Sequence, residues 1–124
     1  MKRLVLVFSC FLFFFCLSSG HVLANKSAVT LEGPASAVKG SEVTIKIMVT
    51  HSANSFLHYT KWLKVQANAQ PLQQWDYTAS NRPEKETFIK EIKIKVLENT
   101  EIAAEANCNM HGSAGPAKLM IQVK

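Results

Sequence analysis

Three histidines and one cysteine are the residues of this chain best suited to chemistry. His51 and His58 are separated by a short loop, and His111 follows Cys108 by three residues. A Cys-x-x-His spacing at a strand end can turn both side chains toward one centre, and Gly112 allows the sharp exit that follows. Thiolate and imidazole are ligands for iron, copper or zinc rather than for magnesium or calcium. We therefore interpret His51, His58, Cys108 and His111 as ligands of one metal ion.

Each of these side chains has a simpler explanation when it is taken alone. A histidine at a strand end can cap a backbone carbonyl, and a single cysteine can fill a hydrophobic core. The metal site is favoured because all four soft donors are expected at the ends of strands, where they can converge.

The elements that must position these ligands are predicted to be strands. Over residues 42–50, β-branched hydrophobic residues alternate with polar ones, which indicates a strand with one buried face. Residues 87–97 alternate in the same way, and no segment has a convincing helical pattern. Turn residues separate five further predicted strands, at 28–32, 59–66, 72–78, 101–107 and 118–123. The sequence thus predicts an all-β, immunoglobulin-like sandwich of about seven strands.

Residues 1–24 are typical of a secretory signal peptide. A basic start, an uncharged apolar run from Leu4 to Leu17 and a small-x-small exit ending at Ala24 are its features, and the run is short for a bilayer span. We prefer cleavage after Ala24 to cleavage after Gly20. The processed protein is then expected to be periplasmic or extracellular, without stable membrane insertion.

Removal of the signal peptide leaves residues 25–124 as a single domain. Two of the basic residues lie in the signal, so the formal net charge falls from +5 to +3. The remaining charges are dispersed, which argues against nucleic-acid binding. Cys10 and Cys16 also leave, and Cys108 becomes the only cysteine of the domain. A lone thiol in an oxidising compartment is exposed to oxidation unless it is buried or bound to a metal.

The ligand segments resemble those of a known family. The five residues from Cys108 to Gly112 read Cys-Asn-Met-His-Gly, similar to the Cys-Asn-x-His-Gly signature of desulfoferrodoxins and superoxide reductases (neelaredoxins). His51, its loop and the sequence His-Tyr-Thr-Lys-Trp at 58–62 resemble the family's His-loop-His-Tyr-Ile-x-Trp segment. The resemblance covers about residues 40–124, in the same order.

The resemblance implies an immunoglobulin-like barrel that holds one mononuclear non-haem iron. In the family, four histidines surround the iron in a plane, a cysteine binds on the axis, and superoxide is reduced to hydrogen peroxide at the open position opposite. By position, Cys108 is the axial ligand, and His51, His58 and His111 are equatorial. The thiolate raises electron density on the iron, and backbone N–H groups just after Cys108 are expected to moderate the charge of its sulfur. Superoxide or another small anion is the implied substrate, with an electron donor that the sequence does not identify.

The chain also departs from the family pattern. The Glu-Lys-His-x-Pro motif, which supplies the first histidine and a lysine, is absent, and so is a Cys-rich rubredoxin-like module. The loop from His51 to His58 is one residue longer than usual and lacks the family's proline. The site is therefore predicted to be His₃Cys. Water, Glu32 or a retained His21 are candidates for the missing ligand, and Lys39 for the missing lysine.

Two other functions stay open at this point. The first is a metal-binding or electron-transfer protein without turnover, with copper as the alternative metal; against a blue-copper site, Ser113 and Ala114 stand where a methionine is expected. The second is a partner-binding sandwich that uses Trp62, Trp75 and Tyr77 as a surface, although we expect all three in the core. The sequence leaves open whether the protein forms a homo-oligomer.

Overall fold

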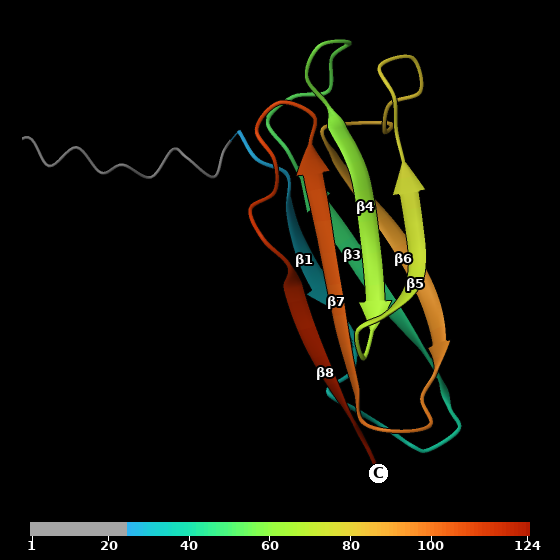
Figure 1. Cartoon of the computed structure of the whole chain (residues 1–124). Helices are drawn as coiled ribbons and strands as arrows, with labels where there is room; N and C mark the ends of the chain where they lie inside the picture. Colours follow the sequence, from blue (N-terminus) through green and yellow to red (C-terminus); the bar gives the residue numbers. More distant parts are fainter. Residues whose placement is uncertain (1–24) are drawn as a thin grey trace, which may run out of the picture.

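The computed structural model describes residues 25–124, which form two β-sheets and no helix (Figure 1). The predicted signal peptide, residues 1–24, lies outside this described part. The fold confirms the predicted all-β sandwich. Its strands are β1 (Ala28–Glu32), β2 (Ser36–Ala37), β3 (Glu42–Thr50), β4 (Thr60–Ala67), β5 (Gln70–Asp76), β6 (Thr87–Lys95), β7 (Thr100–Cys108) and β8 (Ala117–Val123).

The smaller sheet has the strand order β1-β3-β6, and every pair in it is antiparallel. Its central strand β3 has the alternation that the sequence predicts: Ile45, Ile47 and Val49 are fully buried and the residues between them are exposed. In register with Val49 on β6 lies Phe88, which is also buried. One face of this sheet therefore belongs to the core.

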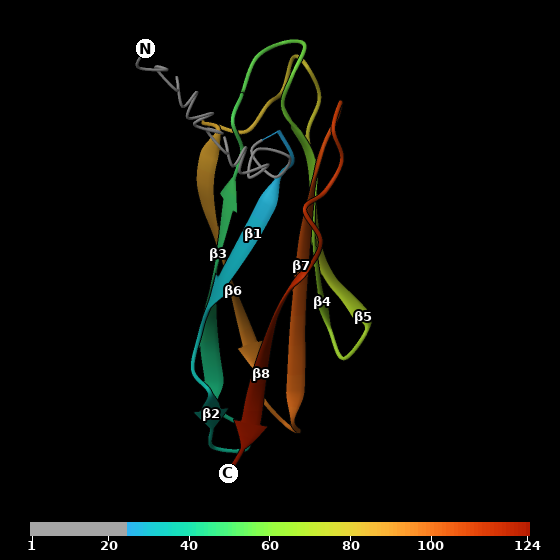
Figure 2. The ribbon, with the colours of Figure 1, turned by 90° about the vertical axis from the view of Figure 1, so that its left-hand side faces the viewer.

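The larger sheet has the order β2-β8-β7-β4-β5, in which only the short β2 is parallel to its neighbour. The two sheets lie face to face as separate layers (Figure 2). Their inner faces form one hydrophobic core, as in other β-sandwiches. Its buried members are Ala37, Ile45, Ile47, Val49, Leu63, Val65, Phe88, Val96, Ile102, Ala104, Ala106 and Ile121.

Several details differ from the prediction, among them the start of β5, which lies at Gln70 and not at Leu72. Strand β2, which has only two residues, was not predicted. Trp62 was expected in the core, but it is half-buried on the outer face of β4, because the neighbouring Leu63 points inward. The ammonium group of Lys64 lies 4.3 Å from the centre of the Trp62 ring. Trp75 and Tyr77 pack against the core, as predicted.

The topology brings three strand ends to one end of the sandwich. β3 ends there, β4 begins there, and β7 ends there with Cys108 (Figure 1). The register pairs Thr60, the first residue of β4, with Cys108, the last residue of β7. This end of the molecule therefore collects the loops that carry the predicted ligands.

None of the described residues belongs to a helix that could cross a membrane.

Candidate metal centre

The two sheets contribute different ligands to this end of the sandwich. His51 directly follows β3 of the smaller sheet, whereas His58 lies just before β4 of the larger sheet. Cys108 is the last residue of β7, and His111 lies in the turn that follows it. The structure thus brings together four side chains from two connections, β3–β4 and β7–β8.

The distances between the four side chains are short. One donor atom from each of His51, His58 and Cys108 lies within 4.8 Å of the other two. The Nδ1 atom of His111 lies 3.1 Å from Nε2 of His58 and 3.8 Å from Sγ of Cys108. The imidazole rings meet edge to face, with centroids 4.7 Å apart for His51 and His58 and 4.8 Å apart for His58 and His111.

The sulfur of Cys108 is buried and receives two backbone hydrogen bonds. The N–H groups of Met110 and His111 each donate to Sγ at 3.4 Å. This is the arrangement expected from the sequence, in which backbone donors after the cysteine moderate the charge of a thiolate. The turn is closed by Gly112, which exchanges backbone hydrogen bonds with Cys108 at 2.9 and 3.1 Å. Gly112 has a φ of +81°, a conformation that favours glycine.

His51 is the buried histidine of the group, with 5% of its surface exposed. Burial is the main reason why its pKa lies below the ordinary value of 6.5, and the neighbouring His58 lowers it further. The ring is therefore neutral near pH 7, so a nitrogen lone pair is available to a metal. The backbone of Asn25 and Ala53 lies close enough to the ring to raise this pKa in part, against the effect of burial. The Nδ1 atom lies 3.5 Å from the Thr60 hydroxyl, whereas the buried Nε2 atom has no partner with good hydrogen-bond geometry.

An unpartnered buried nitrogen is unfavourable unless something binds it. The Nε2 atom of His58 and the Nδ1 atom of His111 lie 3.1 Å apart and share a hydrogen bond, whose proton a metal ion would replace on binding both rings. Three imidazoles and a thiolate also suit iron, copper or zinc, so the residues fit such an ion after small shifts.

Three polar residues near the ligands were missed by the sequence interpretation. Ser27, just before β1, is fully buried, and its hydroxyl lies 2.8 Å from that of Thr60. The side chain of Asn109 bonds to the backbone on both sides of His58. Asn109 lies inside the Cys-Asn-x-His-Gly signature, which was the available signal. The sequence gives no comparable signal for Ser27, which lies 33 residues from Thr60.

The candidates for the missing ligand and lysine lie elsewhere. Ala28, at the start of β1, is in register with Thr50, the residue before His51. Glu32 lies four residues further along β1, about 13 Å away, and its carboxylate pairs with Lys46 at 4.0 Å. Lys39 donates its N–H to the carbonyl of Lys124, at the opposite end of the sandwich. Neither residue is therefore part of the ligand group. His21 lies outside the described residues.

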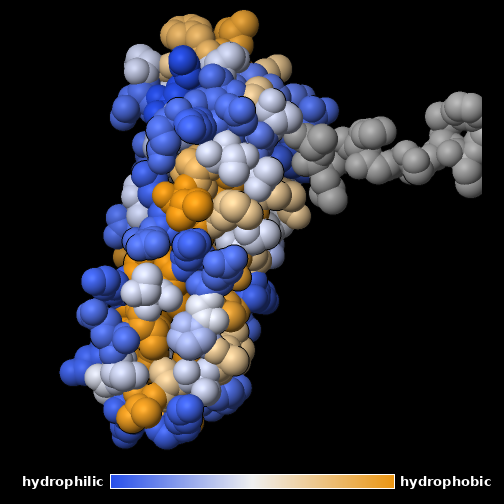
Figure 3. Space-filling model, turned by 180° about the vertical axis from the view of Figure 1, so that it is seen from behind, coloured by the Kyte–Doolittle hydropathy of each residue, from blue (hydrophilic) through white to orange (hydrophobic). Residues whose placement is uncertain are grey.

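Three large hydrophobic side chains are exposed around the ligand group. Phe56, Leu57 and Met110 are 64%, 74% and 62% exposed. Hydrophobic side chains stand out at this end of the molecule (Figure 3). Residues 51–60 and 106–117 contain no lysine, arginine, aspartate or glutamate.

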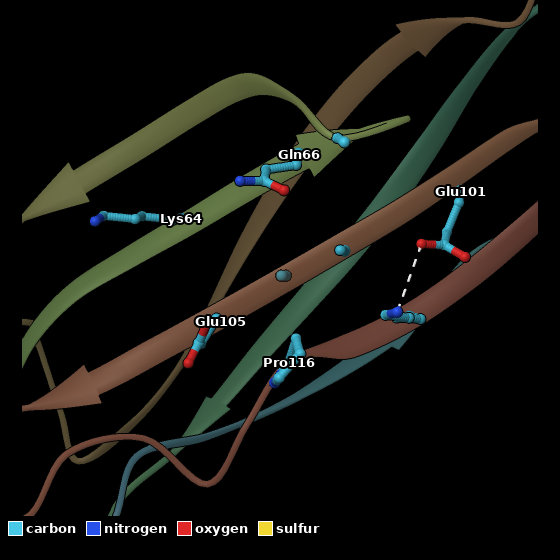
Figure 4. Close-up of a pocket in the computed structure, with 9 residues that line it drawn as sticks. Lys64, Gln66, Glu101, Glu105 and Pro116 are labelled. Carbon is cyan, nitrogen blue, oxygen red and sulfur yellow. Dashed lines mark ion pairs between the residues drawn. The ribbon is translucent and has the colours of Figure 1, made fainter.

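A separate groove of about 310 Å³ lies on the outer face of the larger sheet (Figure 4). Its charged side chains are mixed in sign: Lys64 and Lys118 lie near Glu101 and Glu105, and Lys118 pairs with Glu101 at 3.8 Å. None of the four predicted ligands lines this groove.

Comparison with known proteins agrees with the fold. The structure is similar to the superoxide reductase (neelaredoxin) from Ignicoccus hospitalis, with a TM-score of 0.70, 16% identity, and 86% of this chain and 89% of that chain covered. The reduced form of the Archaeoglobus fulgidus superoxide reductase (neelaredoxin) gives a TM-score of 0.55 at 15% identity, covering 77% and 89%.

The sandwich is shared more widely. The sulfur carrier protein SoxY from Chlorobium limicola f thiosulfatophilum gives a TM-score of 0.54 at 10% identity, covering 77% of this chain and 78% of that one. At such identities these similarities establish the fold alone. No curated protein matches the chain by sequence.

The family itself is established by a sequence model. The desulfoferrodoxin model matches residues 23–113, most of the chain, including both histidine segments and the cysteine turn. The match confirms the resemblance found in the sequence, and the chain belongs to the desulfoferrodoxin family.

Proposed function

We propose that this chain is an exported mononuclear non-haem iron protein that reduces superoxide to hydrogen peroxide. The observation that carries the proposal is the convergence of four soft donors from two sheets, those of His51, His58, Cys108 and His111. The family match supports iron as the metal and superoxide as the substrate. The predicted signal peptide supports export to the periplasm or the cell exterior.

The reaction consumes one superoxide anion, one electron and two protons and releases one hydrogen peroxide molecule. Bound iron would supply the electron, which an external donor then restores. The chain provides the coordination and the access. His51 closes the group on the core side, whereas His111 is exposed and His58 is half-buried, so a small anion and water reach the group from their side.

Cys108 has the clearest electronic role. Its thiolate donates electron density to a metal, and the two N–H donors from Met110 and His111 limit that donation by drawing charge onto themselves. These contacts also hold the sulfur in one position. The turn between Cys108 and Gly112 therefore both supplies the ligand and adjusts its basicity.

A second candidate is a metal-binding or electron-transfer protein without turnover. It is favoured by the ligand loops, residues 51–60 and 106–117, which contain no lysine or arginine to attract an anion. A basic residue at this end is Lys26, next to Ser27, which bonds to Gly112 and Thr60. Copper is the alternative metal under this hypothesis. Both functions require the same four side chains, so a measurement of activity distinguishes them, whereas metal binding does not.

Metal analysis of protein purified without oxygen is the first test. We expect one iron per chain, a visible thiolate-to-iron absorption after oxidation, and loss of that absorption in Cys108→Ser. The matched control is Thr100→Ser, a conservative change at a buried position far from the ligands. A colourless protein without stoichiometric metal would contradict both metal hypotheses.

Superoxide generated in pulses separates catalysis from simple binding. The proposal expects the metal-loaded protein to consume superoxide with one hydrogen peroxide formed per anion, and His58→Ala or His111→Ala to slow the reaction. Consumption no faster than that of the metal-free chain, in a protein that binds iron, would favour the second candidate. N-terminal sequencing of secreted protein, expected to start at Asn25, tests export and cleavage together.

A further inference from the structure

We infer that Asn109 is a positioning residue that holds His58 in place for metal binding. The inference rests on the proposed metal centre and deepens it. His58 precedes β4 and is therefore not held by strand pairing. Its only bonds within its own loop join its backbone to Ser55, as a tight turn with distances of 2.8 and 3.2 Å. Its neighbour Leu57 is exposed and provides little packing.

The amide of Asn109 bonds to the residues on either side of His58. Its Oδ1 atom accepts a hydrogen bond from the Tyr59 N–H at 2.9 Å, and its Nδ2 group donates to the Leu57 carbonyl at 3.0 Å. The backbone N–H of Asn109 donates to the Tyr59 carbonyl at 3.1 Å. Three bonds from one residue thus fix the chain on both sides of His58.

Asn109 is also joined to the other ligands, through the backbone and through its Oδ1 atom, which lies 3.9 Å from Cys108 Sγ. It directly follows Cys108 and lies two residues before His111. Movement of one ligand loop relative to the other would therefore stretch these bonds. The distance of 3.1 Å between His58 Nε2 and His111 Nδ1 is therefore expected to depend on Asn109. Hydrogen bonds that orient ligands commonly change metal affinity by about 10- to 100-fold.

The chain contains a matched control for this amide. At the opposite end of the sandwich, Asn68 Oδ1 accepts from the Glu101 N–H at 2.9 Å, and its Nδ2 group donates to the Asn99 carbonyl at 3.2 Å. The pattern is the same, since each amide joins an N–H to the carbonyl two residues before it. Asn68 bridges a loop that carries no ligand. Its φ of +47° makes alanine more costly there, so Asn68→Ala gives an upper value for the structural cost of losing such an amide.

The test compares Asn109→Ala, Asn109→Gln and Asn68→Ala by titration of the metal-free proteins with Co²⁺ alone. We expect Asn109→Ala to bind Co²⁺ at least about tenfold more weakly and to show a shifted thiolate-to-Co²⁺ absorption. Asn109→Gln keeps the amide but is longer by one methylene, so it should recover part of the affinity. Asn68→Ala should lose thermal stability, and its affinity should stay within twofold of wild type.

A second readout needs no metal. The ring centroids of His58 and His111 lie 4.8 Å apart, so protein prepared without metal should give through-space proton contacts between the rings by NMR. These contacts should disappear in Asn109→Ala and persist in Asn68→Ala. If wild-type protein binds no Co²⁺ or iron, the proposed function fails, while the NMR comparison still decides the role of Asn109.

Two outcomes overturn the inference. One is an Asn109→Ala protein with wild-type Co²⁺ affinity, wild-type spectrum and intact ring contacts. The other is failure of both Asn109 variants to fold while Asn68→Ala folds, which would assign Asn109 to the stability of the whole domain.

Discussion

The hydroxyl of Ser27 lies 2.8 Å from the hydroxyl of Thr60, and both side chains are buried. Ser27 precedes β1 of the smaller sheet, whereas Thr60 begins β4 of the larger one. The same Thr60 oxygen lies 3.5 Å from Nδ1 of His51. The pair therefore connects the two layers directly beside His51, a predicted ligand. Because Nδ1 of His51 faces Thr60, the other ring nitrogen, Nε2, faces away from it.

Replacing Thr60 with valine removes this connection at nearly constant volume. We expect Thr60→Val to lower the free energy of unfolding by about 1–3 kcal/mol, because the buried Ser27 hydroxyl loses its partner. Metal affinity should also fall, because His51 is less well oriented. Denaturant unfolding and Co²⁺ titration measure the two effects.

Thr100→Val is the control for this substitution. Thr100 is also buried, and its hydroxyl donates to the Glu98 carbonyl at 2.8 Å, far from the ligands. A similar loss of metal affinity in both variants would show that Thr60 acts only through overall stability.

The lowered pKa of His51 predicts an acid-sensitive domain. Because the folded state holds His51 neutral, its pKa lies below the 6.5 of the unfolded chain. Its contribution to stability is present above pH 6.5 and is lost as the pH falls through the folded pKa. The free energy of unfolding of the metal-free protein should therefore decrease on acidification from about pH 7.5 to 5.

His51→Gln should make this dependence less steep, since glutamine does not titrate. Urea unfolding at several pH values tests the prediction. Both proteins should lack residues 1–24, the predicted signal peptide, which contains His21. Equal slopes for wild type and variant would mean that other groups cause the acid sensitivity. Metal should leave over the same range because protons compete for the imidazoles.

Tyr77 has a buried hydroxyl without a hydrogen-bond partner. Burial and the nearby Glu84 carboxylate raise its pKa to about 12. Its contribution to stability is therefore complete below pH 10 and is lost as the pH rises toward 12. We expect Tyr77→Phe to be as stable as wild type at pH 7, or more stable by up to about 1 kcal/mol, since the ring still packs on Phe88.

Above pH 10, wild type should lose stability faster than Tyr77→Phe. Thermal unfolding of both proteins between pH 7 and 11 measures the difference. A variant that is clearly less stable at pH 7 would indicate that the hydroxyl has a partner.

Gly112 closes the turn that carries Cys108 and His111. An added Cβ would meet no atom within 4 Å, so the cost of Gly112→Ala comes from its φ of +81°. We expect a loss of about 1–2 kcal/mol and a shifted thiolate-to-metal absorption as the turn relaxes. Gly115→Ala is the control, with a φ of +104° and equally open surroundings. It should lose similar stability without a change in the spectrum.

The strands were predictable where one face is buried and the other is exposed. The predicted strands 42–50 and 87–97 alternate because β3 and β6 each bury one face in the sheet β1-β3-β6. Both begin at the residue expected, and β6 ends two residues earlier, at Lys95. The start of β5 at Gln70 was missed because Pro71 reads as a strand breaker. Since β5 is an edge strand, its proline disrupts no inner ladder. Two-residue β2 is too short to show any period.

The site, too, was predictable only where the sequence carries a local signal. His51, His58, Cys108 and His111 could be proposed because their chemistry is unusual and their spacing is local. The contacts of Ser27 and Asn109 depend on how distant segments align in the fold, at separations of 33 and 50 residues. Hydroxyl and amide side chains are common in loops, so their identity alone does not indicate a supporting role.

The origin of the ligands in opposite layers has a mechanical consequence. An ion held by His51 on one side and by His58, Cys108 and His111 on the other would act as a reversible cross-link between the sheets, in a domain with no disulfide among residues 25–124. Its removal would loosen one end of the sandwich first. Amide protons near Thr50 and Thr60 should then exchange with solvent sooner than those at the far end, so metal supply would govern how long the domain survives proteases.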